Sequence, residues 1–153
     1  MTLPGAFRDW FARQGWQPHP HQIALLAAQG DTLLIAPTGG GKTLAGFLPS
    51  LVALREPPGG LHTLYVSPLK ALTADIARNL ARPVADLGLK VRIEDRTGDT
   101  RPAQRARQRV DPPDILLTTP ESLALMLSYE QAPAIFGGLW RVVLEELHAL
   151  AHI

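Results

Sequence analysis

The chain has 153 residues, 46% of them hydrophobic, and a formal net charge of +1, values typical of one globular domain and not of a disordered chain. So small a charge provides no general attraction for a polyanion, and any contact with nucleic acid would depend on local groups. The absence of cysteine excludes disulfides and thiolate metal sites, and without a signal peptide or a membrane-spanning run the expected location is the cytoplasm.

Short apolar segments alternate with helical patterns, as in a parallel sheet covered by crossover helices. A first helix is expected at 19–29, ending before Gly30. The expected strands are 32–35, 63–66, 90–93, 114–117 and 141–144. The expected helices between them are 43–54, 69–87 (kinked or split by Pro83), 101–109 and 120–128. No helix follows the fifth strand to cover it, so we expect the chain to be part of a longer protein.

The segment after the first expected strand has the spacing of a phosphate-binding P-loop. It reads Ala36-Pro37-Thr38-Gly39-Gly40-Gly41-Lys42-Thr43. Consecutive glycines allow backbone N–H groups to converge on an anion, while Lys42 can reach the outer phosphates and the Thr43 hydroxyl can bind Mg²⁺. We therefore predict a site for ATP and Mg²⁺ formed by Thr38, Gly39, Gly40, Gly41, Lys42 and Thr43.

Two adjacent carboxylates, Glu145 and Glu146, follow the last expected strand. ATP hydrolysis requires a carboxylate that holds Mg²⁺ and a second that orients the attacking water. Glu145 suits the first role and Glu146 the second. His148 is a candidate link between the nucleotide site and moving parts of the protein. An acidic pair at a strand end is also a common solvated feature, but the P-loop upstream favours the catalytic interpretation.

Five ordered motifs resemble those of superfamily-two helicases, closest to the Lhr-like branch and in particular to the ligase-associated DEXH-box helicases of bacterial DNA repair. They are the P-loop at 36–43, Ser67-Pro68-Leu69-Lys70-Ala71-Leu72, Thr97-Gly98-Asp99, Thr118-Thr119-Pro120-Glu121 and Glu145-Glu146-Leu147-His148. The resemblance covers residues 7–150. It implies an α/β fold, a P-loop RecA-like parallel sheet flanked by helices and truncated after about five strands.

The resemblance also implies an organisation and an activity. Residues 1–153 would be the N-terminal part of the first RecA-like domain, with the second RecA-like domain absent. The protein would be an ATP-dependent motor that moves on single-stranded or partly duplex DNA. DNA repair would be its setting, with a DNA ligase or other repair proteins as candidate partners.

One residue departs from the family's pattern. The family's acidic motif is Asp-Glu-x-His, whereas this chain has Glu145 at the first position. The extra methylene moves the carboxylate, and Mg²⁺ requires near-ideal octahedral geometry. We therefore expect Glu145→Asp to raise ATP turnover in the full-length protein.

Residues 15–22 resemble the element that recognises adenine in these helicases. The Gln22 amide can both donate to and accept from the edge of adenine, and Trp16 can stack nearby. The alternatives are a glutamine at a helix start and a core tryptophan.

Three loops that follow expected strands are candidates for DNA contact, because open α/β sheets bind ligands at the carboxyl ends of their strands. They contain Pro68 and Lys70, Thr97 and Gly98, and Thr118 and Thr119. Thr119 also suits the cap of a helix that has Pro120 in its first turn. Contacts of this kind hold the backbone of the DNA without reading its sequence.

A group of arginines between Arg92 and Arg109 has two interpretations. It could belong to a DNA track, or it could lie on a solvated surface balanced by Asp95, Asp99 and Asp111. We favour the solvated surface. Two other functions also remain open for the whole chain: a P-loop NTPase or kinase acting on a small molecule, and a non-catalytic nucleotide-binding module.

Overall fold

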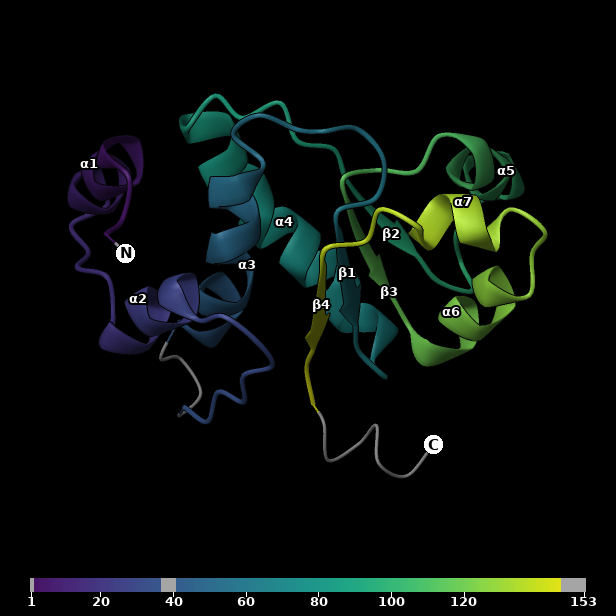
Figure 1. Ribbon diagram of the computed structural model, residues 1–153, viewed down its shortest axis with the longest axis horizontal. Helices are drawn as coiled ribbons and strands as arrows, with labels where there is room; N and C mark the ends of the chain where they lie inside the picture. The colour runs from purple at the N-terminus through teal and green to yellow at the C-terminus, as the bar shows by residue number, and fades with distance from the viewer. Residues whose placement is uncertain (1, 37–40, 147–153) are drawn as a thin grey trace.

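The computed structural model describes residues 2–36 and 41–146, and a four-stranded parallel sheet lies at its centre (Figure 1). The strands are β1 (Thr63–Val66), β2 (Ile93–Arg96), β3 (Ile115–Thr118) and β4 (Arg141–Leu144). Their order across the sheet is β2-β3-β1-β4. Because all neighbours are parallel, the carboxyl ends of the four strands meet at one edge. The predicted α/β class with a parallel sheet is therefore confirmed.

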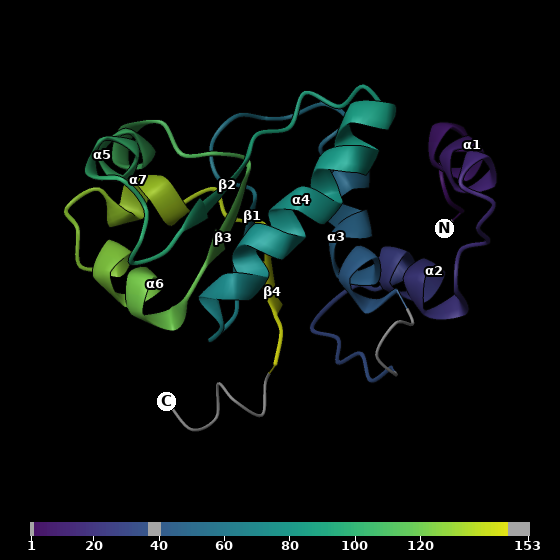
Figure 2. The same ribbon diagram turned by 180° about the vertical axis from the view of Figure 1, so that it is seen from behind.

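Helices cover both faces of the sheet, as the two opposite views show (Figures 1 and 2). In the described residues they are α1 (Gly5–Arg13), α2 (Pro20–Ala27), α3 (Lys42–Ala53), α4 (Lys70–Asp86), α5 (Pro102–Val110), α6 (Pro120–Leu127) and α7 (Ala132–Phe136). Helices α3 and α4 lie on one side of the sheet and α5 to α7 on the other. None of the helices within 2–36 and 41–146 has the length and apolar character needed to cross a membrane.

Alternation along the strands produces two separate hydrophobic clusters. Tyr65, Ile115 and Leu117 pack toward α3 and α4, in a cluster that also contains residues of α1 and α2. Leu64, Val66 and Leu116, whose side chains point the opposite way, pack with Met126 of α6 and Ile135 of α7. Strands that are buried on both faces explain the continuous apolar runs in the sequence.

The N-terminal helix α1 belongs to the larger cluster. Phe7, Trp10 and Phe11 are buried. The indole N–H of Trp10 donates to the carboxylate of Asp86, at the end of α4, over 3.0 Å. These contacts tie the start of the chain to the sheet through α4.

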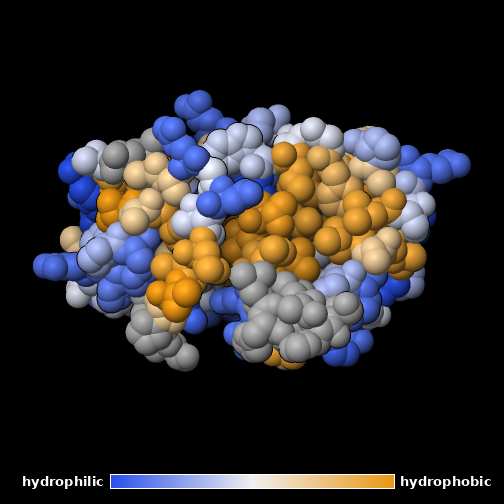
Figure 3. All heavy atoms as spheres, turned by 60° about the horizontal axis from the view of Figure 1, so that its bottom comes forward, coloured by the Kyte–Doolittle hydropathy of each residue, from blue (hydrophilic) through white to orange (hydrophobic). Residues whose placement is uncertain are grey.

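The strand expected at 32–35, directly before the P-loop, does not form. Residues 31–36 have no strand structure, and Leu33 and Ile35 are 68% and 86% exposed. A cavity separates this segment from the edge strand β4, where Val142 and Leu144 are half exposed. One face of the molecule has a broad hydrophobic area (Figure 3). An apolar sequence makes a strand only beside a partner with free backbone groups, and here β4 lies out of reach.

Two other expectations require correction. The strand expected at 90–93 is found at Ile93–Arg96, because its backbone pairing with β3 begins with Ile93 opposite Ile115. Its charged residues Glu94 and Asp95 are tolerated at the edge of the sheet. The helix that contains Pro83 is not split, because α4 continues from Lys70 to Asp86 with Pro83 in its last turn.

Gly46 sets how closely α3 approaches β4. A Cβ at this position would lie 3.3 Å from Cγ1 of Val143. We expect Gly46→Val to lower the free energy of unfolding by about 1–3 kcal/mol, because the added methyl groups push α3 away from the sheet. Urea denaturation followed by circular dichroism measures the change.

Gly138→Val is the matched control for this substitution, because a Cβ at Gly138 meets nothing within 4 Å. Its effect should stay within about 0.5 kcal/mol. Equal effects of the two substitutions would contradict close packing of α3 on β4.

Candidate nucleotide site and strand-end pocket

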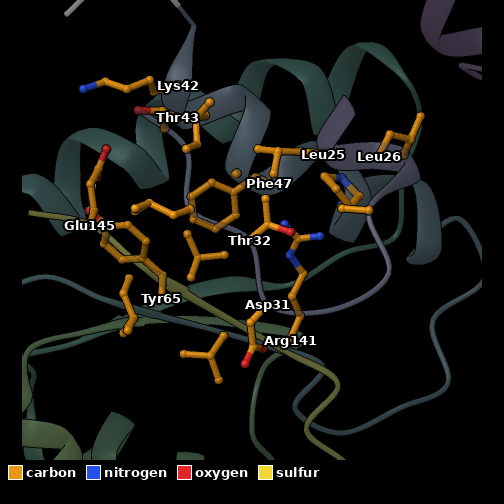
Figure 4. A pocket seen from close by; sticks show the side chains of 18 of the residues that line it. Leu25, Leu26, Asp31, Thr32, Lys42, Thr43, Phe47, Tyr65, Arg141 and Glu145 are labelled. Carbon is orange, nitrogen blue, oxygen red and sulfur yellow. Dashed lines mark hydrogen bonds between the residues drawn. The ribbon is translucent and has the colours of Figure 1, made fainter. Parts of the chain in front are cut away.

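A cavity of about 1120 Å³ lies between residues 25–36, the start of α3 and β4 (Figure 4). Lys42 and Thr43 line it from α3, and Glu145 and Glu146 line it from the end of β4. Folding thus brings together the two sequence motifs on which the predicted ATP site depends. Figure 4 shows Lys42, Thr43 and Glu145 at one end of the cavity and Asp31 and Arg141 at the other.

The last glycine of the P-loop has a conformation that requires glycine. Gly41 has φ of 74°, and a Cβ there would lie 2.7 Å from Nε2 of Gln22. It precedes α3, so Lys42 and Thr43 form the first turn of a helix, where free N–H groups and the helix dipole favour anions. Thr38, Gly39 and Gly40, predicted to bind the nucleotide, lie outside the described residues, as does His148.

Gln22 connects α2 to the P-loop. Its side chain is buried, its amide oxygen accepts from the His19 N–H over 2.8 Å, and its amide nitrogen donates to the Gly41 carbonyl over 3.2 Å. Gln22 is only 2% exposed and is not among the residues that line the cavity, so its contact with adenine stays a prediction. Trp16 is half exposed and meets the ring of Trp10 edge-on, with 5.7 Å between the ring centroids.

The register of β4 against β1 determines where the acidic pair lies. Val66 is opposite Leu144, and the next N–H, that of Glu145, donates to the Val66 carbonyl over 3.2 Å. Glu145 therefore remains attached to the sheet. Glu146 has φ of 56°, in the left-handed region that residues other than glycine adopt only rarely.

Tyr65 is a residue of this site that the motif analysis missed. Its hydroxyl donates a hydrogen bond to Oε2 of Glu145. Burial, followed by that bond and the Glu145 charge, raises the pKa of Tyr65 far above its usual range, so the phenol stays protonated and remains a donor. The sequence signal was a single aromatic residue in the strand Thr63-Leu64-Tyr65-Val66. Its partner is 80 residues away, so the contact required knowledge of the strand order.

The oxygen groups at this end of the cavity fit Mg²⁺ bound together with a nucleotide. Among residues 2–36 and 41–146 there is no group of three or more His, Cys, Asp or Glu that could hold a metal ion without other ligands. Mg²⁺ at nucleotide sites needs only one or two protein oxygens, because phosphates and water complete its octahedron. The Thr43 hydroxyl and the Glu145 carboxylate line the same cavity and are oxygen donors of the required kind.

A second cavity of about 400 Å³, which we call the strand-end pocket, lies where the three candidate DNA loops meet. Its lining includes Pro68, Lys70, Gly98 and Thr119, from the loops after β1, β2 and β3. Lys70 forms an ion pair with Asp99 over 2.9 Å, and both side chains are more than half exposed. An exposed pair of this kind is weak, so the Lys70 ammonium remains available to an anion.

Arg105 of α5 holds the loop after β2 in place. Its guanidinium donates to the carbonyls of Thr97 and Gly98 over 3.1 and 2.6 Å. The Thr97 hydroxyl accepts from the N–H of Asp99, and the Thr97 N–H donates to the Thr100 hydroxyl. Sequence analysis placed Arg105 on a solvated helix, whereas its side chain fixes part of the strand-end pocket.

The two threonines after β3 have different environments. Thr118 is fully buried, and its hydroxyl donates to the Arg96 carbonyl over 2.7 Å. Thr119 occupies the N-cap position of α6 with Pro120 in the first turn, as expected. The expected capping bond is absent, however, since the Thr119 side chain makes no such hydrogen bond. The backbone of Thr119, with φ of −109° and ψ of 160°, has the β-region conformation that an N-cap residue requires, even though the side-chain bond is missing.

Carboxylates balance part of the arginine group, as expected for a solvated surface. Arg92 binds Asp111 through two nitrogens, over 2.8 and 3.0 Å, and Arg107 pairs with Glu94. Arg96 differs, because it is buried and donates to the Tyr129 hydroxyl over 2.6 Å. The guanidinium of Arg109 lies 3.8 Å from the centroid of the Tyr129 ring. Buried arginine is rare, which is why sequence analysis missed Arg96.

Known proteins match the part of this chain that carries these motifs. The family model for DEAD/DEAH box helicases matches residues 19–152. The chain is 42% identical over 161 residues to the "Lhr helicase/ probable uracil glycosylase" of Mycolicibacterium smegmatis, covering 94% of this chain and 11% of that protein. It is 34% identical over 164 residues to the "ATP-dependent helicase Lhr-Core" of Methanocaldococcus jannaschii, covering 95% of this chain and 20% of that protein.

The fold also matches solved helicases. The M. smegmatis helicase Lhr bound to ssDNA and AMP-PNP superposes with a TM-score of 0.89 at 39% identity, covering 97% of this chain and 21% of that one. The helicase MrfA bound to DNA and AMPPNP superposes with a TM-score of 0.83 at 26% identity, over 97% of this chain and 22% of that one. The chain spans only about a tenth to a fifth of the length of these curated relatives. With a family match over residues 19–152 and identities that extend along nearly the whole chain, this chain belongs to the DEAD/DEAH box helicase family.

Proposed function

We propose that this chain is the N-terminal ATP-binding part of an ATP-dependent DNA helicase or translocase, in which ATP hydrolysis drives movement on single-stranded DNA. The observation that carries the proposal is the cavity lined by both Lys42 and Thr43 and the Glu145–Glu146 pair. The strand-end pocket opens at the same edge of the sheet, and the relative at 39% identity is named as bound to both ssDNA and AMP-PNP.

In this proposal each residue of the nucleotide site has a distinct role. The N-terminus of α3 and the Lys42 ammonium hold the phosphates, and the Gln22 amide reads the adenine edge. Thr43 and Glu145 hold Mg²⁺, which when bound neutralises charge on the phosphates. Glu146 orients the water that attacks the terminal phosphate. Thr38, Gly39 and Gly40 complete the phosphate cradle, and His148 links the site to moving parts.

The strand-end pocket would bind the DNA backbone. Lys70 offers a cation, Gly98 allows close approach, and the loops that also contain Pro68, Thr97, Thr118 and Thr119 shape the surface. In this role Lys70 exchanges the Asp99 carboxylate for a phosphate. Such contacts are independent of base sequence, as a translocating motor requires.

The complete motor would need a second RecA-like domain to supply an arginine finger, a group that contributes about 10³–10⁵ in rate in related phosphoryl transfers. We propose DNA repair in the bacterial cytoplasm as its setting. The support is that two relatives have names combining helicase with uracil glycosylase. A DNA ligase is a further candidate partner.

Substitution of the P-loop lysine tests the nucleotide site. We expect Lys42→Ala to weaken binding of a fluorescent ATP analogue with Mg²⁺ by about ten- to a hundredfold, because a charge-assisted hydrogen bond contributes about 1.5–3 kcal/mol. Lys90→Ala is the control, since Lys90 is exposed and lies before β2, at the opposite edge of the sheet. Equal affinities of Lys42→Ala and the wild-type chain would contradict the site.

Substitution of Lys70 tests the strand-end pocket. Lys70→Ala should weaken binding of a single-stranded oligonucleotide and reduce the slope of log K against log salt by about 0.7, the value for one phosphate contact on a single strand. Fluorescence anisotropy at several salt concentrations measures both quantities. Asp99→Asn should strengthen binding, because it releases Lys70. If Lys90→Ala reduces the slope as much as Lys70→Ala, binding is not directed by the pocket.

A further inference from the structure

Tyr65 and Glu145 lie on the same face of the sheet. In the parallel pairing of β1 with β4, Tyr65 is opposite Val143, and Glu145 is two residues further along on the same side. The hydroxyl of Tyr65 bridges this diagonal to Oε2 of Glu145. Figure 4 shows both side chains beneath Lys42 and Thr43. The carboxylate expected to hold the metal is therefore bonded to a buried strand through its side chain.

We propose that Tyr65 is a positioning residue for Glu145: its hydroxyl holds one oxygen of the carboxylate and so directs the other toward the metal position beside Thr43. This inference rests on the proposed function of the cavity as a site for ATP and Mg²⁺. It identifies a residue outside all five sequence motifs as part of that site.

The length of the Glu145 side chain makes this contact possible. Aspartate is shorter by one C–C bond, about 1.5 Å, so its carboxylate at the same backbone position would fall short of the Tyr65 hydroxyl. The backbone is fixed independently, through the bond from the Glu145 N–H to the Val66 carbonyl. Tyr65 thereby compensates for a side chain longer than the aspartate of the family motif.

Tyr65 can restrain Glu145 because its own position is fixed. Its ring is buried against Phe47 of α3, with 5.5 Å between the ring centroids. A glutamate side chain has several free torsions, and one bond to a fixed hydroxyl removes most of that freedom before the metal arrives. Because the ring supplies the packing and the hydroxyl supplies the restraint, Tyr65→Phe separates the two contributions.

The test measures how much Mg²⁺ is needed for half-maximal binding of a fluorescent ATP analogue. We expect Tyr65→Phe to raise that concentration by about three- to tenfold, without changing the weaker binding measured in EDTA. In a Glu145→Asp background, Tyr65→Phe should have no effect, because the shorter side chain does not reach the hydroxyl. Tyr129→Phe, which removes the hydroxyl bonded to Arg96, should leave the Mg²⁺ dependence unchanged. Thermal melting verifies that each variant folds.

A second measurement needs no nucleotide. In chain labelled with ¹³C at the glutamate carboxyl carbon, the Glu145 signal is identified by its loss in Glu145→Asp. It should move in Tyr65→Phe and stay in Tyr129→Phe. An unmoved signal would overturn the proposal even if nucleotide binding could not be measured.

The two proposals can fail separately. If Lys42→Ala binds the ATP analogue as well as the wild type, the proposed function fails whatever Tyr65 does. If Lys42→Ala loses binding while Tyr65→Phe leaves the Mg²⁺ dependence unchanged, the positioning role is overturned and the proposed function stands. The same conclusion follows if Tyr65→Phe shifts the Mg²⁺ dependence equally in the wild-type chain and in the Glu145→Asp background.

Discussion

The backbone pairing of β1 with β4 is the contact on which both sites depend. It aligns Val66 with Leu144, so that Glu145 emerges directly after the last ladder position and beside Tyr65. The same strand β1 continues into the loop that contains Pro68 and Lys70, part of the strand-end pocket. A register shift of one residue would turn Glu145 to the opposite face and remove it from the cavity that Lys42 and Thr43 line.

Nucleotide and nucleic acid would therefore bind along one edge of one sheet, in the proposed function. Parallel strands bring all their carboxyl ends to that edge, and the helices α3 and α4 begin there with Lys42 and Lys70. The two lysines occupy equivalent places, each at the first residue of a helix that follows a loop. In the proposed function, this arrangement would provide two anion sites without any excess of positive charge in the chain as a whole.

The elements that sequence patterns predicted well are those whose signals are local. Helix α3 and strands β1 and β4 follow apolar runs bounded by glycine, proline or charged residues, and they were placed to within a residue. The segment 32–35 has the same local signal but no partner strand beside it, and it stays irregular. The contact from Tyr65 to Glu145 and the burial of Arg96 against Tyr129 depend on which segments become neighbours in the fold. Local sequence patterns do not contain that information.

In the proposed function, the nucleotide cavity and the strand-end pocket act as parts of one DNA-driven motor. The most direct test is the ATP turnover of the full-length protein that carries this chain, measured with and without single-stranded DNA. Single-stranded DNA should raise turnover, and the stimulation should fall as salt weakens DNA binding. Turnover that is the same with and without DNA would rule out such a motor and favour an NTPase acting on another substrate.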